Sequence, residues 1–327
     1  MTIQAASDAD FYEGKTIRVL VGSRRGVAYD LYARLLAQHI GKYLPGWPSF
    51  AVENMAEAGA RGVAGIVFRA KPDGLTLGAI SPELCLSQLL GAKETAGDWA
   101  RFSWIGTLDR SSHLLYMRAD TGYKSIFDII GASQPPRCGA SGNTSLGFYL
   151  PKLLQEIVGA KFSMVTGYGE GPDVDTAVER GELDCRALTV SGFFSHEPYP
   201  SWLRSGFVRV LLQTGKRRDS RLPEAPTIYE LMNEHRVDES GRRLAQVVLS
   251  AALFGRPIVA PPGIHAERIK MLRDAFQKAA SDPELLAEAK ERNLGITPAS
   301  GAELEWLASE MTSKAREILE RLKRLSS

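Results

Sequence analysis

The residues near the amino terminus that could bind a ligand form a turn between an apolar strand and an amphipathic helix. Ile17 to Val21 carries the branched side chains of a buried parallel strand, and Gly22 to Gly26 contains poor strand formers that force a turn. Leucine and isoleucine then recur at helical spacing from Leu31 to Ile40. Such a unit directs backbone N–H groups and the positive end of the helix at one point. That point suits a carboxylate or a phosphate.

Charged side chains in this turn extend its chemistry. A guanidinium from Arg24 or Arg25 could grip a carboxylate with two parallel hydrogen bonds, or both arginines could lie in solvent. Asp30 could accept a hydrogen bond from a ligand or simply favour the helix dipole. Both pairs of alternatives stay open at this stage. The candidate ligand-binding residues of the turn are Ser23, Arg24, Arg25, Gly26, Val27, Ala28, Tyr29 and Asp30.

A second turn with similar chemistry follows a later strand. It precedes the helical segment Leu146 to Val158 and offers hydroxyl and N–H donors, and its glycine lets a ligand approach the backbone closely. The alternative interpretation is an ordinary helix cap, because serine and threonine are common at helix starts. The candidate residues here are Ser141, Gly142, Asn143, Thr144 and Ser145.

Three smaller candidates lie elsewhere in the chain. Tyr168, within the glycine-rich segment Thr166 to Pro172, could bound a ligand with its ring. Ser81 ends a predicted strand and could supply a hydroxyl, although serine before proline is also plain turn chemistry. Ser191 and Phe193 follow another strand and could form part of an aromatic wall, although phenylalanine is more often a core residue.

Alternating strand-like and helical patterns must position these turns. They predict α/β architecture, with helices covering both faces of mostly parallel sheets. The 327 residues exceed the size at which one core usually keeps growing, so we expect two lobes. The predicted strands are Thr16 to Val21, Phe50 to Glu53, Leu75 to Ile80, Trp104 to Leu108, Leu114 to Arg118, Arg137 to Ser141, Phe162 to Thr166, Ala187 to Val190 and Val208 to Gln213.

The later part of the chain is predicted to return to the first lobe. Val247 to Val259 reads as extended or crossing structure, and amphipathic helices are expected over His265 to Ala280 and Ala302 to Leu325. We therefore expect one discontinuous lobe from residues 1–112 and 226–327, and a second lobe from residues 113–225.

Composition argues against several classes of protein. The net charge is +2, from 40 basic and 38 acidic side chains, so no electrostatic field favours nucleic acid. No apolar run approaches the roughly 20 residues needed to cross a bilayer. Cys85, Cys138 and Cys185 are widely spaced and odd in number, and we interpret them as buried free thiols.

Catalytic and metal-binding signatures are also missing. The five histidines form no H-E-x-x-H pattern, no C-x-x-C occurs, and Gly139 to Asn143 lacks the final glycine of a nucleophile elbow. We therefore expect no enzyme activity, no metal and no cofactor. Hydrolysis of a small carboxylate ester or amide survives as a weak alternative, since a distant serine, histidine and aspartate could still meet in space.

Several motifs together resemble one family across nearly the whole chain. The chain resembles the tripartite tricarboxylate transporter receptors, also called Bug or TctC-like solute-binding proteins. Those receptors usually carry prolines and glycines where this chain has Arg24 and Arg25. The motifs that carry the resemblance are Lys15 to Gly22, Gly26 to Asp30 with Ala33-Arg34, Val52 to Asn54, Ala58 to Gly62, Ala70 to Leu77, Gly171-Pro172, Gly181 to Asp184, Leu222 to Thr227 and Pro257 to Gly263.

The resemblance implies a fold, a function and a location. It implies the two-lobed type II periplasmic-binding-protein fold, with a ligand cleft between lobes that closes over a small carboxylate. It further implies a monomeric periplasmic receptor that delivers its ligand to the membrane permease subunits of the transporter. An alternative is a periplasmic sensor that acts on a signalling partner. No signal-peptide pattern precedes Phe11, and we expect that a signal peptide has been removed.

Overall fold

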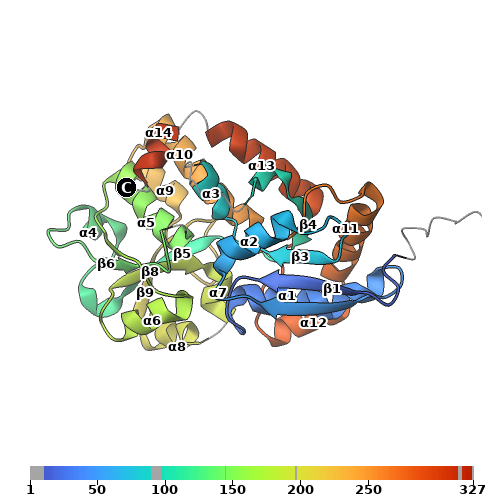
Figure 1. The fold of residues 1–327 in the computed structure, drawn as a ribbon. Helices are drawn as coiled ribbons and strands as arrows, with labels where there is room; N and C mark the ends of the chain where they lie inside the picture. Colours follow the sequence, from blue (N-terminus) through green and yellow to red (C-terminus); the bar gives the residue numbers. More distant parts are fainter. Residues whose placement is uncertain (1–10, 90–96, 144, 196, 316–318, 326–327) are drawn as a thin grey trace, which may run out of the picture. The chain divides into compact units, whose positions relative to one another are not determined.

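The chain folds into two compact units, each with its own sheet (Figure 1). The computed structural model describes residues 11–327 except 90–96, 144, 196, 316–318 and 326–327. Unit 1 comprises residues 1–110 and 254–312, and unit 2 comprises residues 111–253 and 313–327. Unit 2 therefore includes residues 226–253 and 313–327, which we expected in the first lobe.

Unit 1 is built on a six-stranded sheet with the order β11-β4-β10-β3-β1-β2. β1 pairs in parallel with β2 and β3, whereas β10 and β11 pair antiparallel with their neighbours. The sheet is thus mixed, and not mostly parallel as predicted, because the strands added from the later chain run the opposite way. The strands are β1 (Thr16–Val21), β2 (Ser49–Asn54), β3 (Thr76–Ala79), β4 (Ser103–Thr107), β10 (Ile258–Ala260) and β11 (Ala299–Ser300).

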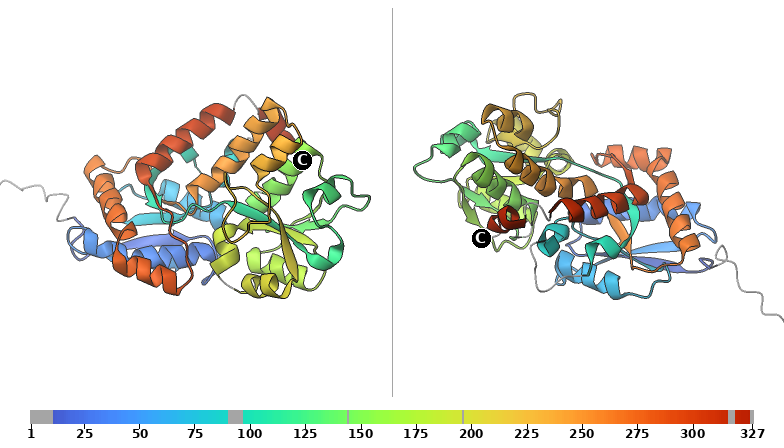
Figure 2. Two further views of the ribbon diagram at one scale, coloured as in Figure 1. Left: turned by 180° about the vertical axis from the view of Figure 1, so that it is seen from behind. Right: turned by 90° about the horizontal axis from the view of Figure 1, so that it is seen from above.

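Helices cover both faces of this sheet. On one face α1 packs with α11 and α12, which Figure 2 shows side by side in orange. On the other face α2 packs against β1 and β3. Ile17, Val19 and Val21 of β1 are buried in a core that also contains Leu35 and Phe276. The helices are α1 (Ala28–Ile40), α2 (Gly59–Arg69), α3 (Leu84–Leu89), α11 (Ala266–Ala280), α12 (Pro283–Glu291) and α13 (Gly301–Ala315), with short 3₁₀ turns at Gly41–Tyr43 and Trp99–Arg101.

Unit 2 has a five-stranded sheet with the order β7-β6-β8-β5-β9. It is also mixed, since β6 pairs in parallel with β7 and β8 while β5 pairs antiparallel with β8 and β9. The strands are β5 (His113–Arg118), β6 (Arg137–Gly139), β7 (Ser163–Val165), β8 (Cys185–Thr189) and β9 (Val208–Gln213). The helices are α4 (Ile126–Ile130), α5 (Leu146–Val158), α6 (Gly171–Glu179), α7 (Val190–Ser195), α8 (Tyr199–Ser205), α9 (Ile228–Glu234), α10 (Glu239–Ser250) and α14 (Leu319–Arg324), with a 3₁₀ turn at Ala119–Thr121.

The segment from Val247 to Val259 matches its prediction in part, because the chain returns from unit 2 to unit 1 between Leu253 and Phe254 and β10 is extended, whereas the residues before that crossing are helical. Its first residues continue α10, which Asp238 caps by accepting from the Gly241 N–H at 2.6 Å. A 3₁₀ turn follows at Ala251–Phe254, and β10 is short. The adjacent valines suggested an extended strand, but with Leu244 they share the buried face of the helix. Burial of this helix face therefore outweighed the preference of branched side chains for strands.

Within the predicted helix Ala302 to Leu325 the structure describes α13 and α14, and α14 belongs to unit 2. Arg321 and Arg324 of α14 both pair with Glu156 of α5, at 3.0 and 2.8 Å. These contacts explain why the end of the chain joins unit 2 although α13 begins in unit 1.

The cysteines and the apolar character of the helices agree with the sequence. Cys85, Cys138 and Cys185 are buried free thiols, which confirms that interpretation. Within the part of the chain that the structure describes, no helix combines the length and apolar character needed to span a membrane.

Candidate functional site

The turn after β1 is positioned by a close approach to α2. A Cβ added at Gly22 would lie 2.5 Å from the carbonyl carbon of Gly59, so only glycine fits there. Gly59 itself has φ +63° and begins α2. The glycine turn of the first motif and that of the Ala58 to Gly62 motif therefore pack against one another.

Asp30 holds this turn in shape through a buried network. Its Oδ2 accepts from the Gly26 N–H at 2.8 Å, and its Oδ1 accepts from Arg34 Nε at 2.8 Å and from Asn54 Nδ2 at 2.9 Å. Asn54 also donates to the Ser23 carbonyl at 3.0 Å. Burial by itself would raise the pKa of Asp30, but the hydrogen bonds from Arg34, Gly26 and Asn54 lower it below its ordinary value.

This geometry favours a scaffold role for Asp30. Both carboxylate oxygens are engaged by the protein, and the side chain of Asp30 is only 1% exposed. Gly26 has φ +87°, a left-handed conformation that its bond to Asp30 helps to fix. The α1 helix begins directly after Val27, which has no side-chain cap. The first-turn N–H groups of a helix have no intrahelical acceptor, so the turn remains suited to an anion.

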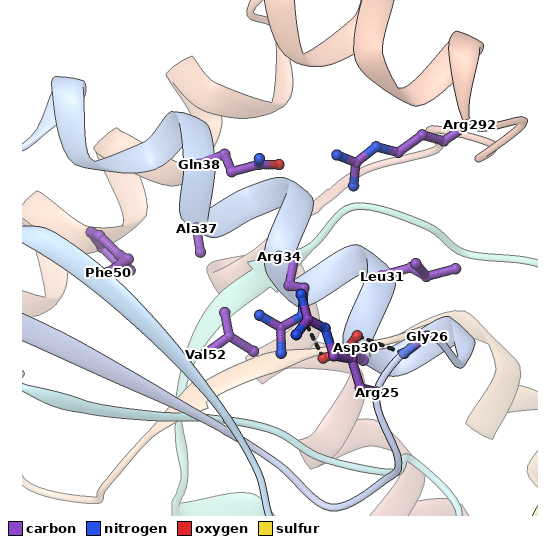
Figure 3. A pocket seen from close by; sticks show the side chains of 10 residues that line it. All are labelled: Arg25, Gly26, Asp30, Leu31, Arg34, Ala37, Gln38, Phe50, Val52 and Arg292. Atoms are coloured by element: carbon purple, nitrogen blue, oxygen red, sulfur yellow. Dashed lines mark hydrogen bonds and ion pairs between the residues drawn. The ribbon is translucent and has the colours of Figure 1, made fainter.

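Arg25 lines a pocket formed by this turn, α1 and β2. The pocket has a volume of about 480 Å³ and runs along α1 towards β2 (Figure 3). Arg24 and Arg25 are exposed, whereas Ser23, Val27 and Ala28 are half-buried. The pocket is lined by Arg25, Gly26, Asp30, Leu31, Arg34, Ala37, Gln38, Phe50, Val52 and Arg292.

Tyr29 and Ser81, predicted from distant parts of the chain, are brought together in unit 1. Ser81 donates to the carboxylate of Glu83, and Glu83 in turn acts on the hydroxyl of Tyr29 through its charge. Burial and the charge of Glu83 raise the pKa of Tyr29. The carboxyl ends of β1 and β3 are neighbours in the sheet, which explains why residues following them meet.

Sequence reasoning missed the charged pair next to this cluster. Arg256 and Asp109 form a buried ion pair, with side chains 7% and 3% exposed. The guanidinium of Arg256 lies 4.7 Å from the ring centre of Tyr32 and 5.9 Å from that of Tyr29. No local motif marks either residue, because their pairing depends on β4 and β10, which are adjacent in the sheet but far apart in the sequence. Arg34 and Asn54, by contrast, stood in the family motifs.

The second predicted turn lies in unit 2 at the start of α5. Ser145 caps the helix, since its Oγ accepts from the Phe148 N–H at 3.3 Å and donates to the Gly142 carbonyl at 2.9 Å. Ser141 and Asn143 are exposed. A Cβ at Gly142 would meet nothing within 4 Å, so its backbone faces open space. Thr144 lies outside the described residues.

The remaining predicted residues of unit 2 are not all surface groups. Tyr168 is half-buried and packs against the core of the unit. Ser191 is buried in α7, and its N–H donates to Ser111 Oγ at 2.8 Å. Phe193 is fully buried, with its ring stacked on Tyr199 at 5.4 Å. Phe193 is therefore a core residue and leaves the candidate site.

A second buried charged network, also missed from the sequence, braces unit 2. Tyr116 donates to Asp175 Oδ1 at 2.7 Å, and Tyr199 and Arg186 both bind the other oxygen of Asp175. Burial and the charge of Asp175 raise the pKa of Tyr116. The guanidinium of Arg186 packs against Gly171, where an added Cβ would lie 2.4 Å away. This contact explains a glycine at the start of α6.

One group of side chains among the described residues has the ligand types of a metal site. His39, Asp282 and Glu284 lie close enough to share an ion. However, Lys42 Nζ pairs with Asp282 at 2.6 Å and with Glu284 at 2.7 Å. The ammonium of Lys42 thus already supplies the positive charge that these carboxylates need.

Comparisons with known proteins identify the family. Residues 32–323 match the family described as the tripartite tricarboxylate transporter family receptor. A Cupriavidus necator protein named for the gbd 5′ region is 25% identical over 97% of this chain and 90% of its own length. A protein from the Agrobacterium vitis ttuE-ttuC′ intergenic region is 25% identical over 90% of this chain and 79% of its own. The chain belongs to the tripartite tricarboxylate transporter receptor family.

Solved structures show the same fold. The periplasmic binding protein BugD matches with a TM-score of 0.72 and 17% identity, over 95% of this chain and 98% of its own. MatC from Rhodopseudomonas palustris, with bound malate, matches with a TM-score of 0.69 and 20% identity, over 96% and 99%. A second R. palustris protein, with adipate, matches with a TM-score of 0.71 and 18% identity, over 94% of this chain and 97% of its own. The predicted family and fold are thus confirmed.

Proposed function

We propose that this protein is an extracytoplasmic receptor that captures a small carboxylate and delivers it to the membrane permease of a tripartite tricarboxylate transporter. The observation that carries the proposal is a repeated arrangement in a chain of this family. Unit 1 has a strand, a glycine turn and a helix start at β1–α1, and unit 2 has the same sequence of parts at β6–α5. Two such turns can bind two ends of one ligand if the units close over it.

The chemistry of both turns is that of anion binding through neutral donors. Gly142 has open space where a side chain would stand, so a carboxylate can approach the backbone of the second turn closely. In the first turn the Gly26 N–H already donates to Asp30, which leaves the first-turn N–H groups of α1 as the donors for a ligand. The first turns of α1 and α5 add the positive ends of their helix dipoles. Ser141 and Asn143 add exposed polar side chains to the second turn.

The ligands of related proteins agree with this class. Malate is bound to MatC and adipate to a second R. palustris protein of the same fold. We propose a dicarboxylate or an aromatic carboxylate for the present chain, held without chemical conversion. We further propose that the protein acts as a monomer in the periplasm.

A thermal-shift panel tests the proposal. Malate, adipate, succinate, benzoate and terephthalate would be compared at fixed pH and ionic strength with their amides or alcohols as uncharged controls. A ligand at 100 times its dissociation constant stabilises the native state by about 2.7 kcal/mol. We expect at least one carboxylate to raise the Tm while its uncharged analogue does not. If no carboxylate does so, the proposal is wrong.

A matched pair of glycine variants tests the location. Gly142→Val places a side chain over the proposed anion position, whereas Gly131→Val places one at a second open position of unit 2, after α4. We expect Gly142→Val to abolish the ligand-induced shift and Gly131→Val to keep it. Equal ligand shifts in both variants would exclude the second turn from the site.

A further inference from the structure

The outer edge of the unit 1 sheet is formed by β2. Within the described residues, β2 pairs only with β1, in an unbroken parallel register. Ser49 N donates to Lys15 O at 3.1 Å, and Met55 N donates to Val21 O at 2.8 Å. Because backbone groups alternate in direction along a strand, the odd-numbered residues face β1. Phe50 and Val52 therefore direct their N–H and C=O groups away from the sheet.

These same two residues line the pocket beside α1. Phe50 and Val52 are half-buried and, with Leu31 and Ala37 of α1, give the pocket an apolar part (Figure 3). The edge is not protected in the usual way, since β2 contains no proline, no lysine and no bulge. Its one charged residue, Glu53, is bound by Arg18 at 2.7 Å through each oxygen.

The rim of the pocket is positively charged. Its lining contains the guanidinium groups of Arg25, Arg34 and Arg292 and a single carboxylate, that of Asp30. Asp30 is already bound by Arg34 at 2.8 Å. Arg292 pairs with Glu288 outside the lining, and no carboxylate of the described chain pairs with Arg25. An occupant with negative side chains would thus find complementary charge beside the apolar part.

We propose that this edge binds an extended acidic segment of a partner protein as an added strand on β2. The segment's backbone would pair with the outward groups of Phe50 and Val52, and its apolar side chains would enter the pocket. Its aspartate or glutamate side chains would meet Arg25 and Arg292. A small free anion would use the arginines but would leave the row of backbone groups unpaired. The inference does not depend on the proposed carboxylate ligand.

A peptide library tests this surface. The intact protein would be screened against ten-residue peptides that alternate apolar residues with Asp or Glu, and against a matched library with Lys in place of the acids. We expect binding from the acidic library only. The tightest peptide would then be used in hydrogen exchange, where the Phe50 and Val52 amides should gain protection while that of Ala51, which faces β1, should not change.

Two variant pairs separate the backbone from the charge. Val52→Pro removes an outward N–H without removing a bond to β1, and Val52→Ala is its control. Arg25→Glu reverses a pocket charge, and Arg69→Glu reverses an exposed arginine of α2 outside the pocket. We expect Val52→Pro and Arg25→Glu to weaken peptide binding at least tenfold, and the two controls to weaken it less than twofold. Circular dichroism would verify that each variant is folded.

Several results would overturn the proposal. They are equal binding of acidic and basic peptides, no binding from the acidic library, or unchanged binding by Val52→Pro. Full competition by free citrate without any protection of Phe50 and Val52 would instead assign the arginines to a small anion, and would also overturn an added strand.

Discussion

The two glycine turns have the same parts but different supports. In unit 1, the turn before α1 is held by the buried carboxylate of Asp30, which binds Gly26, Arg34 and Asn54. In unit 2, the turn before α5 is held by the neutral hydroxyl of Ser145. A helix start can therefore be fixed either by a buried charge network or by a single cap, and the loss of stability differs when that support is removed.

The glycines of the two turns differ in the same way. Gly22 is locked against the backbone of α2, whereas Gly142 faces open space. The inner side of the unit 1 turn is therefore in close contact with the start of α2. The unit 2 turn leaves its glycine accessible. Four sets of variants test whether the two turns differ in this way.

Asp30→Ala should cause the largest loss of stability. Removing one partner of a buried ion pair costs about 3–5 kcal/mol. Because the side chain of Arg34 is 28% exposed, we expect the lower end of that range. Urea unfolding followed by circular dichroism measures the effect, with Asp30→Asn as the variant that keeps shape and removes charge. A loss below about 1 kcal/mol, the size of a simple cap, would erase the contrast with unit 2.

Gly22→Ala should lower the free energy of unfolding, whereas Gly142→Ala should raise it. The new Cβ at position 22 would lie 2.5 Å from the Gly59 carbonyl, which cannot move without shifting α2. Overpacking of this kind costs about 1–3 kcal/mol. At position 142 nothing is within 4 Å, and a compatible glycine-to-alanine change stabilises a protein by about 0.4–1 kcal/mol. Equal unfolding midpoints in urea for the two variants would contradict the close approach of Gly22.

Ser145→Ala should lower stability by about 1 kcal/mol, as expected for the loss of an N-cap. The Phe148 N–H loses its side-chain acceptor, but no buried charge is created. Ser145→Asp provides the control, since aspartate also caps helices and should recover the loss. If Ser145→Ala destabilised the protein as much as Asp30→Ala, the two turns would not differ in their support.

The pH dependence of stability should show a small contribution from Asp30. Its pKa in the folded protein lies below its unfolded value of about 3.9. Its stabilisation is therefore fully present above the unfolded pKa and is lost as the pH falls through the lower folded pKa. Urea unfolding between neutral pH and pH 3 measures this loss. Asp30→Asn should flatten the acid side of the curve, and Ser145→Ala should leave its slope unchanged.

Local pattern was enough to predict the bounds of several elements, including one that flanks each turn. β1, α5 and β9 have the bounds that their sequence patterns indicated, because branched runs and helical periodicity there agree with burial. The pattern was misleading at Val247, where a valine pair lies on a buried helix face, and at Phe193, whose ring fills the core. In both places apolar side chains fit two structures, and packing chose between them.

Local patterns were sufficient to indicate the family, the two turns and the strand–turn–helix units that present them. They were sufficient because glycine, serine and the apolar repeats act over a few neighbouring residues. The folded chain was needed to show that Asp30 supports the turn, that Arg256 pairs with Asp109, and that Arg25 lies beside an open strand edge. These outcomes depend on desolvated contacts between distant segments, whose strength comes from burial and geometry that no short pattern contains.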